Sequence, residues 1–145
     1  MALIAVVDDL FFAVKVRETA RQTGVAVHVV GAAKFQAALE TRAAEETIEA
    51  VIVDLSSAAA LEVIGALKQD AGTRSLPVIG FVSHVAVDVI TAARAAGCDQ
   101  VLARSAFTKQ LPELLRSLGQ GSGIRGQGSG NDSPVQTRRL SSQGS

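Results

Sequence analysis

The sequence has little of what marks secreted, membrane-spanning or strongly charged proteins. Its single cysteine, Cys98, excludes a disulfide within the chain and gives no sign of an oxidising compartment. No apolar run approaches the roughly 18 residues of a membrane-spanning helix, and the first residues lack the basic start and cleavage site of a signal peptide. The formal net charge is zero, which gives no electrostatic reason to expect nucleic acid as a partner. We therefore expect a cytoplasmic protein that contacts no membrane and binds no DNA directly.

Two short apolar runs that end in carboxylates stand out among what is present. Residues 50–53 lead into Asp54, and residues 3–7 lead into Asp8 and Asp9. Uninterrupted runs of this kind are typical of parallel strands buried on both faces, and ligands bind outside the carboxyl ends of such strands. If the two strands are neighbours, three carboxylates converge at one edge. Their mutual repulsion favours a hard divalent cation held by oxygen ligands.

Strand and helix patterns alternate along residues 1–118. The alternation indicates right-handed crossovers between parallel strands. The predicted fold class is α/β: a doubly wound, five-stranded parallel sheet, flavodoxin-like, with strand order 2-1-3-4-5, in which strands 1 and 3 are adjacent. The expected strands are 3–7, 25–30, 50–54, 77–83 and 100–103, and the expected helices are 10–22, 33–44, 58–69, 87–96 and 107–118.

The composition changes abruptly at Gly119. Residues 119–145 consist mainly of Gly, Ser and Gln and cannot bury enough apolar surface to offset the entropy of ordering. They carry three arginines and a single acidic residue. We therefore predict one domain at 1–118 and a flexible tail at 119–145, with no second folded domain after residue 118.

Four short motifs fall at or near the strand ends: Val7-Asp8-Asp9, Val53-Asp54-Leu55, Pro77-Val78-Ile79 leading to Ser83, and Ala96-Gly97-Cys98-Asp99. In this order and at these spacings, residues 1–118 resemble the receiver domain of bacterial response regulators, similar to the chemotaxis regulators of two-component signalling. The resemblance covers the whole predicted domain and leaves out the tail.

The resemblance implies a role for each candidate site residue. Asp54 corresponds to the aspartate that accepts a phosphoryl group, a known form of covalent chemistry for carboxylates. Asp8 and Asp9, with Asp54 and the backbone carbonyl of Ser56, correspond to the ligands of Mg²⁺, which offsets the repulsion between phosphate and carboxylate. Ser83 corresponds to the hydroxyl residue that contacts the phosphoryl oxygen.

The resemblance also implies partners. The phosphoryl donor is a sensor histidine kinase or a phosphotransfer protein, and a downstream protein contacts the face made by residues 87–96, 100–103 and 107–118. The protein is then a single-domain response regulator, a monomer or weak homodimer, in a phosphorelay. It is a phosphoprotein that at most dephosphorylates itself, not an enzyme.

Three positions in and after the fifth strand depart from the receiver pattern. Arg104 stands in place of the lysine that follows the fifth strand; it keeps the charge and could grip phosphate bidentately, but its planar fork differs from an ammonium group. Ser105 replaces a cis-proline, and because a cis bond before another residue costs roughly 2.5–4 kcal/mol, we expect a trans bond. Val101 replaces an aromatic residue that swings inward on activation.

These departures keep two alternatives open. One is a pseudo-receiver, a protein-interaction module that retains the acidic pocket but no longer switches on phosphorylation. The other is an enzyme of the same fold class, such as a nucleotide-binding protein or an aspartate-dependent phosphatase. The chain lacks a glycine-rich loop after the first strand and has adjacent Asp8 and Asp9 where such a phosphatase has Asp-x-Asp, which disfavours the enzyme.

Overall fold

The computed structural model describes residues 2–83 and 87–119. The chain divides into two units, Met1–Pro112 and Glu113–Ser145. Within the second unit the described residues continue one helix, where Arg116 pairs with Glu113. The predicted tail beyond Gly119 lies outside the described residues. No helix in the described ranges is both long and apolar enough to cross a membrane.

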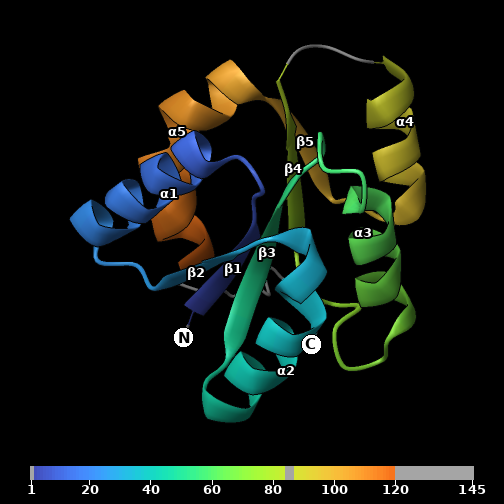
Figure 1. The fold of residues 1–145 in the computed structure, drawn as a ribbon, viewed down its shortest axis with the longest axis horizontal. Helices are drawn as coiled ribbons and strands as arrows, with labels where there is room; N and C mark the ends of the chain where they lie inside the picture. Colours follow the sequence, from blue (N-terminus) through green and yellow to red (C-terminus); the bar gives the residue numbers. More distant parts are fainter. Residues whose placement is uncertain (1, 84–86, 120–145) are drawn as a thin grey trace, which may run out of the picture. The chain divides into compact units, whose positions relative to one another are not determined.

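The first unit is built on a parallel sheet. The elements are β1 (Ala2–Val6), α1 (Leu10–Thr23), β2 (Val27–Val30), the 3-10 helix η1 (Ala32–Lys34), α2 (Phe35–Glu45), β3 (Ile48–Asp54), α3 (Ala60–Gln69), β4 (Val78–Val82), α4 (Val87–Ala96), β5 (Gln100–Ala103) and α5 (Arg104–Gly119). The sheet order is β2-β1-β3-β4-β5, with every pair parallel (Figure 1). The predicted fold class and strand order are confirmed.

Both faces of the central strands are buried. All five residues of β1 are inaccessible, and alternate ones, including Ile4 and Val6, join the core beneath α2, α3 and α4. The intervening Leu3 and Ala5 face the opposite side, where Figure 1 shows α1 and the start of α5. Side chains alternate between the faces of a strand, so a strand covered on both sides must be apolar throughout. This is why the sequence shows unbroken runs at both strands.

The connections differ from the prediction at two helices. The helix expected at 107–118 begins at Arg104, directly after β5, and Thr108 Oγ1 donates to the Arg104 carbonyl at 2.8 Å within its first turn. With Ser105 in place of proline, no residue here opposes a continuous helical backbone. The described residues contain no cis peptide bond, as expected. The helix expected at 33–44 is split into η1 and α2.

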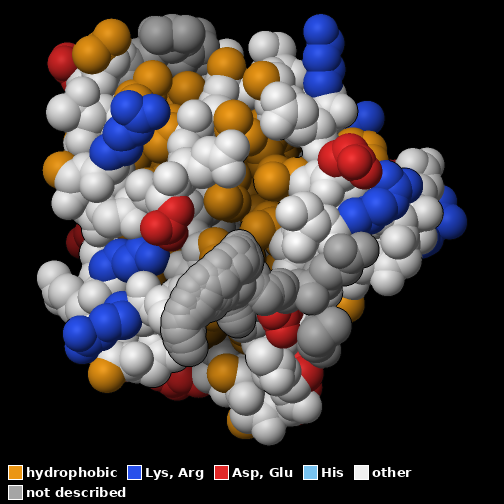
Figure 2. Space-filling view, turned by 180° about the vertical axis from the view of Figure 1, so that it is seen from behind, with side chains coloured by type: hydrophobic (Ala, Val, Ile, Leu, Met, Phe, Trp, Pro, Cys, Tyr) orange, Lys and Arg blue, Asp and Glu red, His pale blue; other side chains and the backbone are white. Residues whose placement is uncertain are grey.

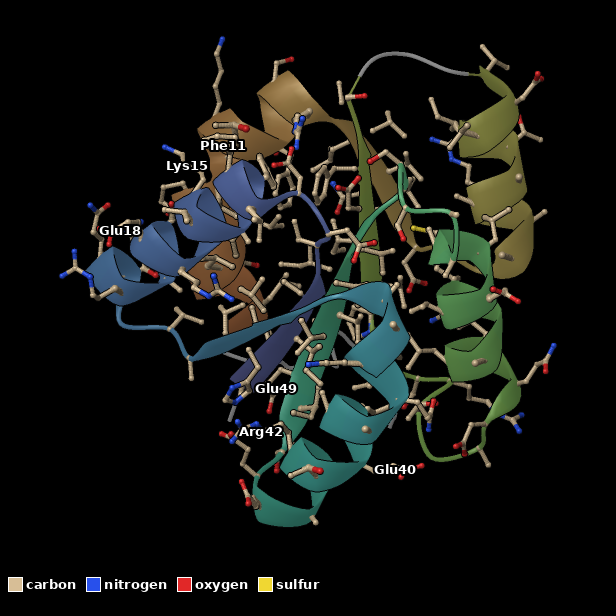
Figure 3. All side chains as sticks on the ribbon, in the orientation of Figure 1. Phe11, Lys15, Glu18, Glu40, Arg42 and Glu49 are labelled. Carbon is tan, nitrogen blue, oxygen red and sulfur yellow. The ribbon has the colours of Figure 1, made fainter. Side chains whose placement is uncertain are left out.

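Charged side chains occupy the outer surfaces of the helices. Figure 2 shows Lys and Arg together with Asp and Glu on either side of a strip of apolar side chains, with neither sign forming a continuous area on that face. In Figure 3, Lys15 and Glu18 lie on the outside of α1, and Glu40 lies on the outside of α2. Interspersed charges agree with the balanced composition.

Two glycines offer a stability test with opposite expected signs. Gly97, which ends α4, has φ +113°, and a Cβ there would lie 2.6 Å from Lys68 Cγ. Gly97→Ala is expected to lower the free energy of unfolding by roughly 1–3 kcal/mol because of backbone strain. Gly65 lies inside α3 with open space around it, so Gly65→Ala is expected to raise stability by about 0.5–1 kcal/mol. Urea unfolding followed by circular dichroism measures both changes. Changes in the free energy of unfolding of the same sign for the two variants would contradict the assigned backbone conformations.

Candidate functional site

The predicted site residues meet at one edge of the sheet. Val6 of β1 pairs with Val53 of β3, so the acidic residues that follow both strands leave the sheet side by side. Val82 of β4 pairs with Ala103 of β5, and Ser83 and Arg104 are the next residues in each chain segment. The register therefore places all the predicted side chains at the carboxyl ends of neighbouring strands, as the sequence indicated.

Asp54 has one occupied oxygen and one free oxygen. Its side chain is buried, with 3% of the residue exposed, and Oδ1 accepts hydrogen bonds from Ser56 N–H at 3.0 Å and Ser56 Oγ–H at 2.6 Å. Oδ2 accepts none in the described part of the chain, where the sole buried side-chain polar atom without a partner is Arg104 Nε. Within the described residues, Asp54 Oδ2 is therefore the carboxylate oxygen without a donor. The predicted role of Ser56 involved only its backbone carbonyl. An Asp followed two residues later by Ser is a turn signal that predicts this side-chain hydrogen bond.

Asp8 joins two loops. Its Oδ1 accepts from Ala32 N–H at 3.1 Å and its Oδ2 accepts from Ser57 Oγ–H at 2.8 Å. The loop after β2 and the loop after β3 are thereby tied to the end of β1. This role of Ser57 was not predicted, because a contact across 49 residues depends on how the loops are placed in space.

Asp9 begins α1 and holds Arg104. Its Oδ1 accepts from Phe11 N–H at 2.9 Å and Phe12 N–H at 3.3 Å, which caps the helix. Its Oδ2 accepts from Arg104 Nη2 at 2.9 Å. The hydrogen bond from Arg104 and those from the helix N-terminus hold the pKa of Asp9 below its ordinary value.

Arg104 lies on an aromatic cluster. Its guanidinium carbon is 4.4 Å from the ring centroid of Phe12, close enough for a cation–π contact. Phe12 contacts the rings of Phe81 and Phe107 at 4.7 and 5.7 Å. The stack fixes the guanidinium beside Asp9, and its Nε–H is left buried without an acceptor. This support for Arg104 could not be predicted from the sequence, because the three phenylalanines come from three separate elements.

The three carboxylates do not form a metal cluster in this arrangement. Within residues 2–83 and 87–119, no three Asp, Glu, His or Cys side chains are grouped so as to hold a metal ion. Asp8, Asp9 and Asp54 share one edge of the sheet, yet each has its own hydrogen-bond donors. The binding of Mg²⁺ by these residues stays a prediction.

The ion pair of Asp9 predicts a pH dependence of stability. Because the folded-state pKa of Asp9 lies below its ordinary value of 3.8, the pair stabilises the fold fully above that value and is lost as the pH falls through the lower, folded-state pKa. Asp9→Asn keeps a good helix cap but removes the charge. In thermal unfolding at neutral pH, the wild type is expected to have a higher Tm than this variant. The difference in Tm is expected to disappear below pH 3.8. A difference in Tm that does not change with pH would contradict the ion pair.

No protein-family model matches the chain, and no curated protein matches it. Many solved structures do match. The Mn²⁺-bound form of response regulator Rcp1 superposes with a TM-score of 0.67 at 14% identity, covering 83% of this chain and 96% of that one. Chemotaxis response regulator CheY4 of Vibrio cholerae gives 0.65 at 16% identity, covering 81% and 98%. The phosphorylated cyanobacterial phytochrome response regulator RcpA gives 0.62 at 19% identity, covering 79% and 88%.

The chain has the receiver fold. The likeness to response regulators spans almost the full length of each of these structures. At identities below 20% it establishes the architecture. The chemistry must be argued from the residues at the edge of the sheet.

Proposed function

We propose that this receiver fold is a phosphoacceptor in a two-component phosphorelay, with Asp54 as the accepting residue. The observation that carries the proposal is the state of the Asp54 carboxylate at the carboxyl end of β3: Ser56 fixes Oδ1, and Oδ2 accepts no hydrogen bond from the described residues. A carboxylate fixed by one oxygen presents the other as an oriented nucleophile.

In the proposed step, Asp54 Oδ2 attacks the phosphorus of a phosphohistidine on a histidine kinase or phosphotransfer protein. A bond from phosphorus to oxygen forms as the bond from phosphorus to the imidazole nitrogen breaks, and the imidazole leaves with the electron pair and takes up a proton. Ser83, at the end of β4, and Arg104, at the start of α5, are the candidates to hold the phosphoryl oxygens. The buried Nε–H of Arg104 is a donor that a phosphoryl oxygen would satisfy.

The donor set suits Mg²⁺, because carboxylate and carbonyl oxygens are its usual protein ligands. Asp8, Asp9, Asp54 and the Ser56 carbonyl would hold it, and the metal would offset the charge between phosphate and carboxylate. Asp9 Oδ1 caps α1 and Asp9 Oδ2 accepts a hydrogen bond from Arg104, so Arg104 competes with the metal ion for Oδ2. Two neighbours of the same fold are described as phosphorylated and as Mn²⁺-bound, which supports this assignment.

The proposed output is contact with a downstream protein, with no turnover of a separate substrate. Val87 and Val89 on α4 expose 70% and 36% of their surface, which suits a protein partner on the face of α4, β5 and α5. The alternative of a pseudo-receiver is favoured by the pairing of Arg104 with Asp9, since a built-in cation at the acidic pocket can take the place of a metal ion.

Intact-mass spectrometry after incubation with acetyl phosphate and Mg²⁺ tests the proposal. The wild type is expected to gain one phosphoryl group, and Asp54→Ala is expected to gain none. Glu49→Ala, which removes a carboxylate from the opposite half of β3, is the matched control and should behave as the wild type. No gain in the wild type would reject the phosphoacceptor and leave the pseudo-receiver.

A further inference from the structure

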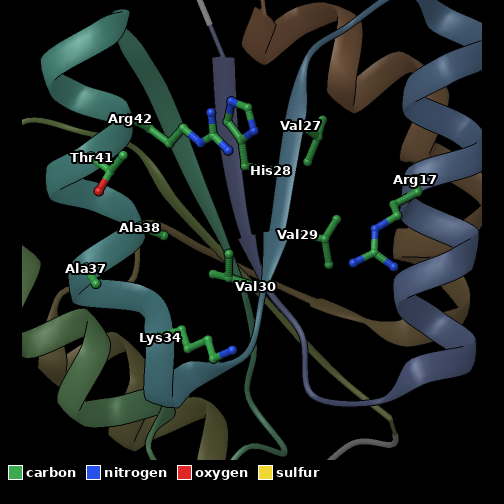
Figure 4. Close-up of a pocket in the computed structure, with 10 residues that line it drawn as sticks. All are labelled: Arg17, Val27, His28, Val29, Val30, Lys34, Ala37, Ala38, Thr41 and Arg42. Atoms are coloured by element: carbon green, nitrogen blue, oxygen red, sulfur yellow. The ribbon is translucent and has the colours of Figure 1, made fainter.

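A groove runs along the free edge of β2, far in sequence from Asp54. Strand β2 has a neighbour on one side only, so its other side ends the sheet. The groove has a volume of about 700 Å³ and lies between α1 and α2 (Figure 4). The wall formed by α2 consists of small side chains, Ala37, Ala38 and Thr41, which leaves room beside the strand.

The backbone of β2 offers hydrogen-bonding groups to this groove. Val7 N–H donates to the Val30 carbonyl, so the backbone N–H and C=O groups of Val30 point toward β1. Because backbone groups alternate in direction along a parallel ladder, those of His28 point toward β1 as well. The N–H and C=O groups of Val27 and Val29 therefore point to the outer side. Such a row can accept a further strand.

The groove is flanked by cations on both faces of the sheet. Figure 4 shows Arg17 reaching toward β2 from α1, and Lys34 and Arg42 reaching toward it from the side of α2. Arg42 pairs with Glu45 at 3.4 Å, whereas Arg17 and Lys34 form no ion pair or hydrogen bond through their side chains within the described residues. The nearby Glu46 is bonded to His28 at 2.9 Å, so its charge is already engaged. The groove therefore carries uncompensated positive charge.

We propose that this edge binds an extended acidic segment of another protein, which adds to the sheet as a strand beside β2. Main-chain hydrogen bonds to Val27 and Val29 provide the affinity, and acidic side chains that alternate across the added strand reach Arg17 on one face and Lys34 on the other. This binding does not depend on phosphorylation at Asp54.

Charge excludes the other occupants that the chain itself could supply. Two copies joined through β2 would bring the Arg17 and Lys34 side chains of both together, which like-charge repulsion disfavours. The segment from residue 120 onward contains three arginines and one aspartate, so it also lacks the complementary charge. An extended acidic segment can both hydrogen-bond to the backbone of β2 and form ion pairs with the flanking cations.

A fluorescein-labelled peptide, Asp-Glu-Val-Glu-Val-Asp-Glu, is the probe, and fluorescence anisotropy with the full chain is the measurement. Saturable binding is expected, at least tenfold weaker for the peptide with Asn and Gln in place of the acids. The double variant Arg17→Gln/Lys34→Gln is expected to weaken binding at least tenfold. Arg94→Gln/Lys109→Gln removes the same charge from α4 and α5 and should leave binding unchanged. Circular dichroism verifies that both variants are folded.

Peptides N-methylated at alternate residues, in both registers, separate strand addition from general attraction. One of the two methylated peptides is expected to lose binding although it keeps its charges, because its methyl groups block the hydrogen bonds to β2. Equal binding of both registers would overturn strand addition and leave electrostatics alone. No saturable binding, or a dimer in sedimentation that the Arg17→Gln/Lys34→Gln variant strengthens, would overturn the acidic partner.

Discussion

Phe81→Ala is expected to lower the free energy of unfolding by about 3–5 kcal/mol. Phe81 is fully buried near the carboxyl end of β4, and its ring centroid lies 4.7 Å from that of Phe12 and 4.5 Å from that of Phe107. Truncation removes its buried apolar surface, leaves a cavity and breaks two ring contacts. Because domains of this size are stable by only about 5–15 kcal/mol, the loss would remove a large share of the total.

Phe11→Ala is the matched control for this prediction. Phe11 lies at the start of α1 with 91% of its surface exposed (Figure 3), so its loss is expected to change stability by at most about 0.5 kcal/mol. Urea unfolding followed by far-ultraviolet circular dichroism suits both, because the chain has no Trp or Tyr for fluorescence. Similar losses for Phe11 and Phe81 would contradict the aromatic core described here.

Arg104→Met is expected to raise the affinity for Mg²⁺ about tenfold, which corresponds to roughly 1.4 kcal/mol. Methionine preserves apolar contact with Phe12 but frees Asp9 Oδ2 and removes a positive charge from the acidic edge. At an effective dielectric constant near 20, like charges about 5 Å apart repel by roughly 3 kcal/mol, so a tenfold gain is a modest expectation. Isothermal titration with MgCl₂ at neutral pH measures it.

The same variant is expected to take up phosphoryl groups from acetyl phosphate more slowly, because a donor to the phosphoryl oxygens is lost. Lys109→Met removes an exposed charge elsewhere on α5 and should change neither property. Unchanged Mg²⁺ affinity in Arg104→Met would show that Asp9 takes no part in metal binding. Faster phosphoryl uptake would show that Arg104 obstructs the acceptor and would favour the pseudo-receiver.

The parts of the structure that the sequence predicts are those set by local pattern. The unbroken apolar run before Asp54 predicts a strand buried on both faces, and the alternation of strands and helices predicts the sheet order. Gly24, with φ +75°, ends α1, as a glycine directly after a helix predicts, and Cys98 is buried and forms no disulfide. In each case one physical requirement acts on neighbouring residues.

The contacts that the sequence did not reveal join residues far apart. The pair between Arg104 and Asp9 spans 95 residues, and the bond from Ser57 to Asp8 spans 49. Both depend on the angle at which a strand passes into the next element. The start of α5 at Arg104 decides where its guanidinium lies, and the prediction placed that start three residues too late.

These long spans have a consequence for how the chain acquires its site. Asp8 holds the loops after β2 and β3, while Asp9 holds the beginning of α5, so almost the whole of the first unit must be assembled before the acidic edge exists. Closing such large loops makes folding slow relative to proteins with local contacts. If Asp54 accepts phosphate as proposed, a nascent or partly unfolded chain would not react with a phosphoryl donor, and only native molecules would be phosphorylated.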